Sequence, residues 1–370
     1  MSAGGVSSAT MPAPGRLRYF KGSIVVTIVG LLAAAGVGFY YKGTLAGAGR
    51  TVFLVAVLSI LEISLSFDNA VVNATVLKHT TPLWRKRFLT WGMAIAVFGM
   101  RFVFPLVVVS VVAQIGPWQA IRLATLQPED YARVLTEAHV PLQAFGGAFL
   151  GMVCLKFFFD ADKSVHWIAP LEKRLAWLGK FEAIEIALML LAIYVFSGVV
   201  PAAVSRPLLN AGIWGLITFI AVDAVGSAME QEDGAAGSGG TSLYRAGMAG
   251  FLYLNVLDAS FSFDGVIGAF ALTNNLFMIA IGLGIGAMFV RSLTIMLVDE
   301  GTLDAYRYLE HGAFYAVGAL SFLMLLSTMI DVPEAVTGLL GAGSIALALW
   351  SSIRYRRRHG STPLDLDAAE

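Results

Sequence analysis

The stretch EISLSFDNA at residues 62–70 returns in altered form as DASFSFDGV at residues 258–266, and both copies lie within long apolar segments. The copies match at polar and aromatic positions, pairing Glu62 with Asp258, Ser64 with Ser260, Ser66 with Ser262, Phe67 with Phe263, and Asp68 with Asp264. A carboxylate at the centre of a membrane helix costs about 3 kcal/mol or more. A chain that carries such groups twice, at matching positions, is therefore predicted to use them.

The composition of the chain is typical of a polytopic membrane protein. Of its 370 residues, 57% are hydrophobic and only 14% are charged, whereas a typical soluble protein carries about 25% charged residues. The formal net charge is zero, which argues against nucleic acid as a partner. The single cysteine excludes an internal disulfide and a cysteine-based zinc site. The first predicted partner is therefore the lipid bilayer.

Apolar segments long enough to cross a membrane recur along the chain. A transmembrane helix needs about 20 mainly apolar residues. The candidates lie near residues 23–41, 51–77, 88–113, 142–159, 182–200, 208–229, 245–272, 276–298, 312–330 and 333–353. The first is longer than the apolar core of a signal peptide, which has about 7–15 residues. We therefore expect an all-α transmembrane bundle of about ten spans, with glycine spacings at 147–151 and 282–286 that favour close helix packing.

The positive-inside rule gives the predicted orientation of these spans. Basic residues cluster before the first span, in the loops at 78–87 and 163–180, and after the last span. With ten spans all of them fall on one side, so both termini are predicted to be cytoplasmic. The predicted divisions are a disordered N-terminus (1–21), a first transmembrane half (22–229), a Gly/Ser-rich linker (230–242), a second transmembrane half (243–353) and a cytoplasmic tail (354–370).

The two motifs fall in the second and seventh predicted spans, which cross the membrane in opposite directions. Arg101 and Arg291 extend the match between the copies, once a shorter loop is allowed in the second. This is an inverted-topology repeat, which in many secondary transporters places the substrate site at the interface between the repeats. The sequence thus predicts one site that both motif helices share.

Each motif presents a strip of polar oxygen atoms if it is helical. Glu62, Ser66, Asn69 and Asn73 follow spacings of four, three and four, so they share one face. Hard divalent cations, and Mn²⁺ among the transition metals, prefer such oxygen ligands. We expect the carboxylates of Glu62, Asp68, Asp258 and Asp264 to hold a cation, with Ser66, Ser262, Asn73, Arg101, Arg291 and Asp223 in support. Gly265 replaces Asn69 in the second copy and predicts a local unwinding there.

The alternative is that these acids pair with Arg101 and Arg291 and only hold the bundle together. Four motif acids face two arginines, so at least two carboxylates need a cation, a proton or water. Single polar residues leave more than one interpretation open. Asp223 and Glu185 either join the site or lie at the membrane interface, whereas Lys156 is expected in a solvated interfacial cluster.

Motifs of nucleophilic chemistry, nucleotide binding and zinc peptidases are absent from the sequence. We therefore expect neither an enzyme nor a pump that hydrolyses ATP within this chain, and no resident cofactor. An intramembrane aspartyl protease would need two aspartates, for which Asp68 and Asp264 are available. The duplicated motif and the predicted inverted symmetry fit a transport pathway better.

The segments EISLSFDNAVV (62–72) and DASFSFDGVIGAFALTNN (258–275) resemble the two signature helices of the TerC-like integral membrane family. The resemblance covers about residues 50–350 and is greatest to a longer bacterial branch. It implies an inner-membrane protein related to tellurite resistance and to manganese exporters. It also implies that the ion-binding positions are Glu62, Asp68, Asn69, Asp258 and Asp264.

Taken together, the sequence predicts a transporter of the bacterial inner membrane that exports a divalent cation, with Mn²⁺ as the first candidate. Protonation of the motif acids would release the ion and couple its efflux to inward proton flow. The protein is a possible homo-oligomer. The alternative is a membrane scaffold or assembly factor in a metal or tellurite stress-resistance complex, without transport activity. An oxyanion exporter is less favoured, because the carboxylates would repel an anion.

Overall fold

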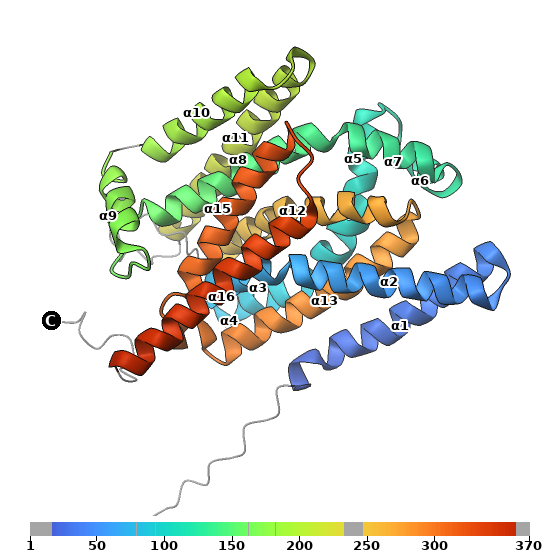
Figure 1. Cartoon of the computed structure of the whole chain (residues 1–370), viewed down its shortest axis with the longest axis horizontal. Helices are drawn as coiled ribbons and strands as arrows, with labels where there is room; N and C mark the ends of the chain where they lie inside the picture. Colours follow the sequence, from blue (N-terminus) through green and yellow to red (C-terminus); the bar gives the residue numbers. More distant parts are fainter. Residues whose placement is uncertain are drawn as a thin grey trace, which may run out of the picture.

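The computed structural model describes residues 17–359 apart from 79, 93, 162, 182 and 233–246, and every regular element in that part of the chain is a helix. The elements are α1 (Leu17–Lys42), α2 (Leu45–Leu65), α3 (Phe67–Lys78), α4 (Pro82–Arg87), η1 (Phe88–Gly92), η2 (Ile95–Val103), α5 (Phe104–Val112), α6 (Pro117–Leu126), α7 (Pro128–Glu137), α8 (His139–Phe158), α9 (Ala169–Leu178), α10 (Ile184–Val199), α11 (Ala202–Glu232), α12 (Gly247–Leu272), α13 (Leu276–Asp299), α14 (Thr302–Ala305), α15 (Leu309–Ser327) and α16 (Glu334–His359). The all-α fold is therefore confirmed for the described residues (Figure 1).

Within the described residues, eight helical segments are long and apolar enough to cross a membrane. They are Leu17–Lys42, Leu45–Leu65, Pro82–Val112, His139–Phe158, Ala202–Val225, Leu276–Asp299, Leu309–Ser327 and Ala335–Arg358. Two of the ten predicted spans are not among them. The segment 182–200 forms α10, an apolar helix of only 16 residues, and 245–272 forms α12, a helix of 26 residues. The chain is thus a multi-pass membrane protein, as predicted, with about eight candidate spans.

Helices α1, α2 and α13 pack against one another (Figure 1). The turn between α1 and α2 contains Gly43, whose φ of +62° is a left-handed conformation that glycine adopts without steric cost. Thr44 then caps α2, because its hydroxyl accepts the N–H of Gly47 at 3.1 Å. Across the interface, Ser23 of α1 donates a hydrogen bond of 2.6 Å to the Met288 carbonyl of α13. The first helix is therefore an integral part of the bundle.

Both glycine spacings noted in the sequence lie at close helix crossings. At 147–151, α8 meets α15, and the Ser321 hydroxyl donates to the Gly147 carbonyl at 2.7 Å. At 282–286, α13 meets α2, where an added Cβ on the first glycine would lie 2.6 Å from Leu58 Cβ. Only residues without a side chain permit these approaches, which is the usual role of such spacings in membrane helices.

Two segments outside the repeated motifs form short helices. The segment 115–140 contains α6 and α7, and the buried Tyr131 of α7 packs on Phe270 of α12 with ring centroids 5.8 Å apart. The segment 160–180 contains α9, whose Glu172 side chain is buried. Both segments therefore pack on the bundle.

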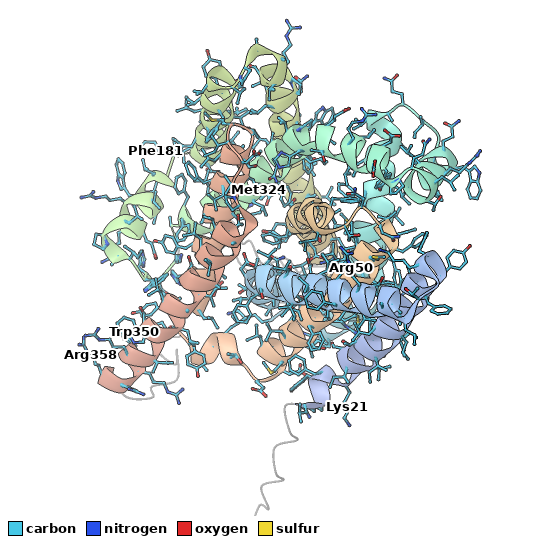
Figure 2. All side chains as sticks on the ribbon, turned by 45° about the vertical axis from the view of Figure 1, so that its right-hand side comes forward. Lys21, Arg50, Phe181, Met324, Trp350 and Arg358 are labelled. Atoms are coloured by element: carbon cyan, nitrogen blue, oxygen red, sulfur yellow. The ribbon has the colours of Figure 1, made fainter. Side chains whose placement is uncertain are left out.

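The helices extend beyond several predicted boundaries. Residues 17–21 of the predicted disordered N-terminus (1–21) are helical, because α1 begins at Leu17, and the predicted tail (354–370) starts as helix, because α16 continues to His359. Basic side chains at helix ends keep their charged groups in water while their stems cover apolar surface, which allows a helix to continue past the bilayer core. Figure 2 shows Lys21 of α1 and Arg358 of α16 toward the same lower edge of the molecule.

The predicted linker at 230–242 is described only in part. Helix α11 continues through Glu232, so the first residues of the linker are helical. The remainder of the linker lies outside the described residues, as do residues 1–16 of the predicted disordered N-terminus and residues 360–370 of the predicted tail.

Candidate functional site

The first motif is divided between two helices. Helix α2 ends at Leu65 and α3 begins at Phe67, and Ser66 between them has φ −100° and ψ 16°. The Ser66 hydroxyl donates a hydrogen bond of 3.1 Å to Glu62 Oε1, and its N–H donates to the Glu62 carbonyl at 2.9 Å. The break therefore points a hydroxyl at the carboxylate one turn earlier.

The second motif is not broken, so the predicted unwinding at Gly265 is wrong. Helix α12 runs without interruption through this position. The glycine has a different role, because a Cβ built on Gly265 would lie 2.9 Å from Glu62 Oε2. Its absence lets the second motif helix approach the first at its acidic residue.

Glu62 lies at the centre of this approach. Its side chain is only 3% exposed and forms an ion pair with Arg101, which is 4% exposed. Helix α13 also closes over it, since a Cβ on Gly286 would lie 2.4 Å from Glu62 Cγ. Arg101 continues the contact to the second motif, because its Nη1 donates to Ser262 Oγ at 3.3 Å and to the Ala96 carbonyl at 2.6 Å. One guanidinium thus joins the two motif helices.

Arg101 projects from a π-helical segment, η2. The N–H of Phe104 donates to the Gly99 carbonyl, five residues earlier, instead of the fourth. The cause lies in the next residue, since Pro105 has no N–H and its ring would crowd the carbonyl of residue 101 in a regular α-helix. Wide turns of this kind are rare in proteins as a whole, and those that occur are often at functional sites.

Asp258 of α12 lies on the other side of this arginine. The half-buried Asp258 carboxylate is within electrostatic reach of both Arg101 and Glu62, and it makes a side-chain hydrogen bond with Asn73 of α3. A cavity of about 20 Å³ adjoins these groups. It is lined by Ser66, Asn69, Asn73, Phe88, Ala96, Arg101, Asp258, Ala287, Val290, Arg291 and Thr294. A cavity of this size holds about one water molecule or one small ion.

Asp68 lies in a second cavity, of about 30 Å³. This cavity is lined by Glu62, Leu65, Ser66, Asp68, Asn69, Phe261, Gly265, Leu320 and Thr337. The buried Asp68 carboxylate accepts the N–H of Asn69 at 3.0 Å, and α16 approaches it so closely that a Cβ on Gly341 would lie 3.2 Å from Asp68 Oδ2. Ser66 and Asn69 line both cavities, which therefore flank the break between α2 and α3.

The predicted site residues are brought together only in part. The half-buried Arg291 lines the first cavity and forms no ion pair with a carboxylate of the described residues. The side chain of Asp264 lies outside the described residues. Among those that the structure does describe, no three His, Cys, Asp or Glu side chains converge as a metal-binding group. A complete cation site is therefore not formed by the described side chains, and the Glu62–Arg101 pair is the contact that the structural alternative predicts.

Two other polar residues of the sequence analysis lie elsewhere. Asp223 of α11 forms an ion pair with Lys156 of α8, whose side chain is only 9% exposed. The expectation that Lys156 is solvated is therefore wrong, because this pairing allows the amine to be buried. Glu185 lies in the first turn of α10, which packs on α8 and α11.

A second buried polar cluster, which the sequence did not predict, lies between α9 and α15. Glu172 of α9 accepts the Tyr315 hydroxyl of α15 at 3.1 Å and lies 3.4 Å from His311 Nε2. The Lys163 amine lies 3.9 Å from Glu172 and 3.4 Å from the centroid of the Phe157 ring. Burial lowers the pKa of Lys163 to about 8, although the neighbouring carboxylates of Glu172, Glu310 and Asp160 act in the opposite direction. The partners come from segments far apart in sequence, so no spacing predicted them.

Comparison with known proteins places the chain in a family but not in a functional class. The chain belongs to the family described as protein of unknown function (DUF475), whose model matches residues 67–359. The match contains Asp68 and the whole second motif and begins shortly after Glu62. No curated protein and no solved structure matches the chain. None of these comparisons connects it with the TerC-like family, so that resemblance stays a prediction.

Proposed function

We propose that this member of the DUF475 family transports a small cation across the membrane through the paired motif helices. Divalent cations are the proposed substrates, with Mn²⁺ the first to test, and protons are the proposed coupling ions. Glu62, Asp68, Asp258 and Asp264 are the proposed ion-binding acids. The bacterial inner membrane is the proposed location.

The observation that carries this proposal is a pair of small cavities that both border Ser66 and whose linings include carboxylate, amide and hydroxyl groups. Carboxylate, amide and hydroxyl oxygens are the ligands of hard divalent cations. Volumes of about 20 and 30 Å³ suit a dehydrated ion or one water molecule. An amino acid or another organic solute would need a pocket about ten times larger.

The charge balance also favours a cation as the substrate. Three described acids of the site, Glu62, Asp68 and Asp258, face two arginines, Arg101 and Arg291, which leaves one negative charge. An uncompensated charge in a buried site is costly. A bound cation or a proton would compensate it, and exchange of one for the other provides a physical basis for coupling. An oxyanion would add to the imbalance.

The proposed mechanism uses the repeat. We take α2–α3 and α12 as antiparallel motif helices of an inverted repeat, so that movement of one half against the other exposes the site to either side. The common position of Lys21 and Arg358 at one edge of the molecule supports a topology with both termini in the cytoplasm (Figure 2). The TerC-like appearance of the motifs supports Mn²⁺ among the divalent cations.

The test is Mn²⁺ flux in proteoliposomes that contain the purified protein, with and without a pH gradient. We expect Asp68→Asn to lower the flux at least about tenfold, the effect of losing roughly 1.4 kcal/mol of interaction with the ion. Glu129→Gln, a change at an exposed acid of α7, is the matched control and keeps wild-type flux. Elution as a single symmetric peak in detergent reports the folded yield of each variant. Absence of flux of any cation from the wild-type protein would overturn the proposal.

The scaffold alternative has one specific observation in its favour, the buried Glu62–Arg101 pair. In a scaffold, the motif acids would serve stability alone. Asp68→Asn would then lower the folded yield, and wild-type proteoliposomes would carry no cation. Normal folded yield together with loss of flux distinguishes the transporter from the scaffold.

A further inference from the structure

We infer that Arg101 is a built-in competitor of the transported cation. Its guanidinium occupies the cation position between Glu62 and Asp258, and the ion binds there only after Arg101 has withdrawn. This inference rests on the proposed function, because it assigns a role to Arg101 within the same site.

The contacts of Arg101 are those of a bound cation. One nitrogen pairs with Glu62, another donates to Ser262 Oγ at 3.3 Å and to the Ala96 carbonyl at 2.6 Å, and Asp258 lies within electrostatic reach. A carboxylate, a hydroxyl and a carbonyl oxygen are also ligands that a divalent cation takes. A second cation within this group of oxygens would meet strong repulsion from the guanidinium, so the two positive charges exclude each other.

A purely structural ion pair would not require the surrounding features. Arg101 borders the first cavity, and Glu62 borders the second. The two residues of the pair thus border different cavities, and Ser66 borders both. Withdrawal of the guanidinium would free the carboxylate oxygens of Glu62 for an ion.

The helix that carries Arg101 has a means of moving it. Conversion of a π-helical turn of η2 into α-helix removes one residue from the turn and rotates the flanking positions by about 100°. Trp91 and Phe98 of η1 and η2 are 71% and 68% exposed, whereas the opposite face of η2, with the buried Ala96 and Arg101, packs on α12 and α13. A rotation of this segment turns the guanidinium away from Glu62 and exchanges its contacts with these two helices.

Arginine suits this role because it keeps Glu62 paired in the empty site. Removing one partner of a buried ion pair leaves an uncompensated charge, which is strongly destabilising. With Arg101 in place, Glu62 has a partner whenever the ion is absent. Exchange between guanidinium and ion then keeps the carboxylate paired throughout the cycle.

The test compares equilibrium binding of Mn²⁺ to purified protein in detergent, from the loss of the electron paramagnetic resonance signal of free Mn²⁺. We expect Arg101→Gln to bind Mn²⁺ about 10–100-fold more tightly than wild type, as removal of a competing buried charge predicts. Mn²⁺ flux is expected to fall in the same variant, because no guanidinium is present to displace the bound ion from the site. Lys156→Gln is the matched control, since it removes a buried cation from a pair away from the site and leaves Mn²⁺ affinity unchanged.

Folded Arg101→Gln protein with unchanged or weaker Mn²⁺ affinity would overturn the inference. If Arg101→Gln does not fold, Arg101→Met replaces it, because methionine removes the charge and keeps a long unbranched side chain. Its Mn²⁺ affinity is expected to rise above that of wild type, and an unchanged affinity overturns the inference. The proposed function fails separately, when wild-type proteoliposomes transport no cation. If the wild-type protein transports a cation but the Arg101 variant binds Mn²⁺ with unchanged affinity, only the role of Arg101 is contradicted.

Discussion

At Glu62, three other helical segments converge on one carboxylate. Gly265 of α12 and Gly286 of α13 give it space, and Arg101 of η2 neutralises it. Ser66 adds a hydrogen bond from the end of its own helix. Such a group is stable only with all of its partners in place, because a buried charge that loses its partner keeps its full desolvation cost. Stability and ion binding therefore depend on the same atoms.

Glu62→Gln is expected to destabilise the protein by about 3 kcal/mol or more, because it leaves the Arg101 guanidinium buried without a counter-charge. Thermal unfolding in detergent measures the effect. The double variant Glu62→Gln with Arg101→Gln removes both charges and should regain most of the lost stability. Equal destabilisation by the double variant and by the sum of the two single variants would show that the pair contributes no coupling.

Gly286→Ala is expected to destabilise the protein by about 1–3 kcal/mol through overpacking. The new Cβ would lie 2.4 Å from Glu62 Cγ and 2.5 Å from Glu62 Cβ, so either α13 or Glu62 has to move. Gly36→Ala in α1 is the control, because no atom lies within 4 Å of its added Cβ. Alanine there should stabilise the helix slightly. Similar unfolding temperatures for the two variants would contradict the close crossing of α13 over Glu62.

At the scale of elements, the apolar segments of the sequence predicted the long helices well, because a membrane forces an apolar run of that length into a helix. The break at Ser66 could not be predicted in this way. Both motif copies have serine at this position, yet only the first is broken. In that copy the Ser66 hydroxyl bonds Glu62, whereas the second copy has the shorter Asp258 one turn earlier. Glutamate and aspartate differ by one methylene group, and a method that counts apolar residues does not distinguish them.

Gly265 and Asp223 show two other limits of the sequence. A glycine within a helical pattern indicates either a break or a close approach, and only the neighbouring helix decides which of the two applies. The neighbour of Gly265 is Glu62, on a helix about two hundred residues earlier in the chain. Asp223 pairs with Lys156 across α11 and α8, and no periodicity in the sequence joins these two positions. Arg101, by contrast, contacts residues of both motifs, and its pairing with Glu62 is the contact that the structural alternative predicts from the sequence.

The attachment of α9 to α15 is expected to depend on pH through Lys163. Its pKa is lowered by burial from 10.5 to about 8. Between these two values the unfolded chain binds more protons than the folded chain, so stability rises as the pH rises from about 8 to about 10.5. The gain is at most about 3 kcal/mol. Thermal unfolding measured at pH 7.5 and pH 10 tests it, with Lys163→Met as the comparison, and an identical pH dependence of the two proteins would contradict the assignment to Lys163.

At the scale of the whole molecule, the proposed inverted repeat requires a definite orientation. With ten spans, the ends of α1 and α16 that carry Lys21 and Arg358 are cytoplasmic, and the α6–α7 segment with Glu129 is on the opposite side. Figure 2 shows Lys21 and Arg358 toward one edge of the molecule. This arrangement needs an even number of spans between the two ends. Both the ten spans predicted from the sequence and the eight candidate spans of the described residues are even in number.

Single-cysteine labelling in intact cells measures this orientation. Cys154 is the only native cysteine, so its replacement by alanine gives a background without thiols. In that background, Glu129→Cys should react with a membrane-impermeant maleimide from outside, because this position is exposed and lies on the outer side in the proposed topology. Lys21→Cys and Arg358→Cys, also exposed in wild type, should react only after the cells are permeabilised. Labelling of one terminus from outside would make the number of spans odd. The ten-span topology with both termini in the cytoplasm would then be wrong.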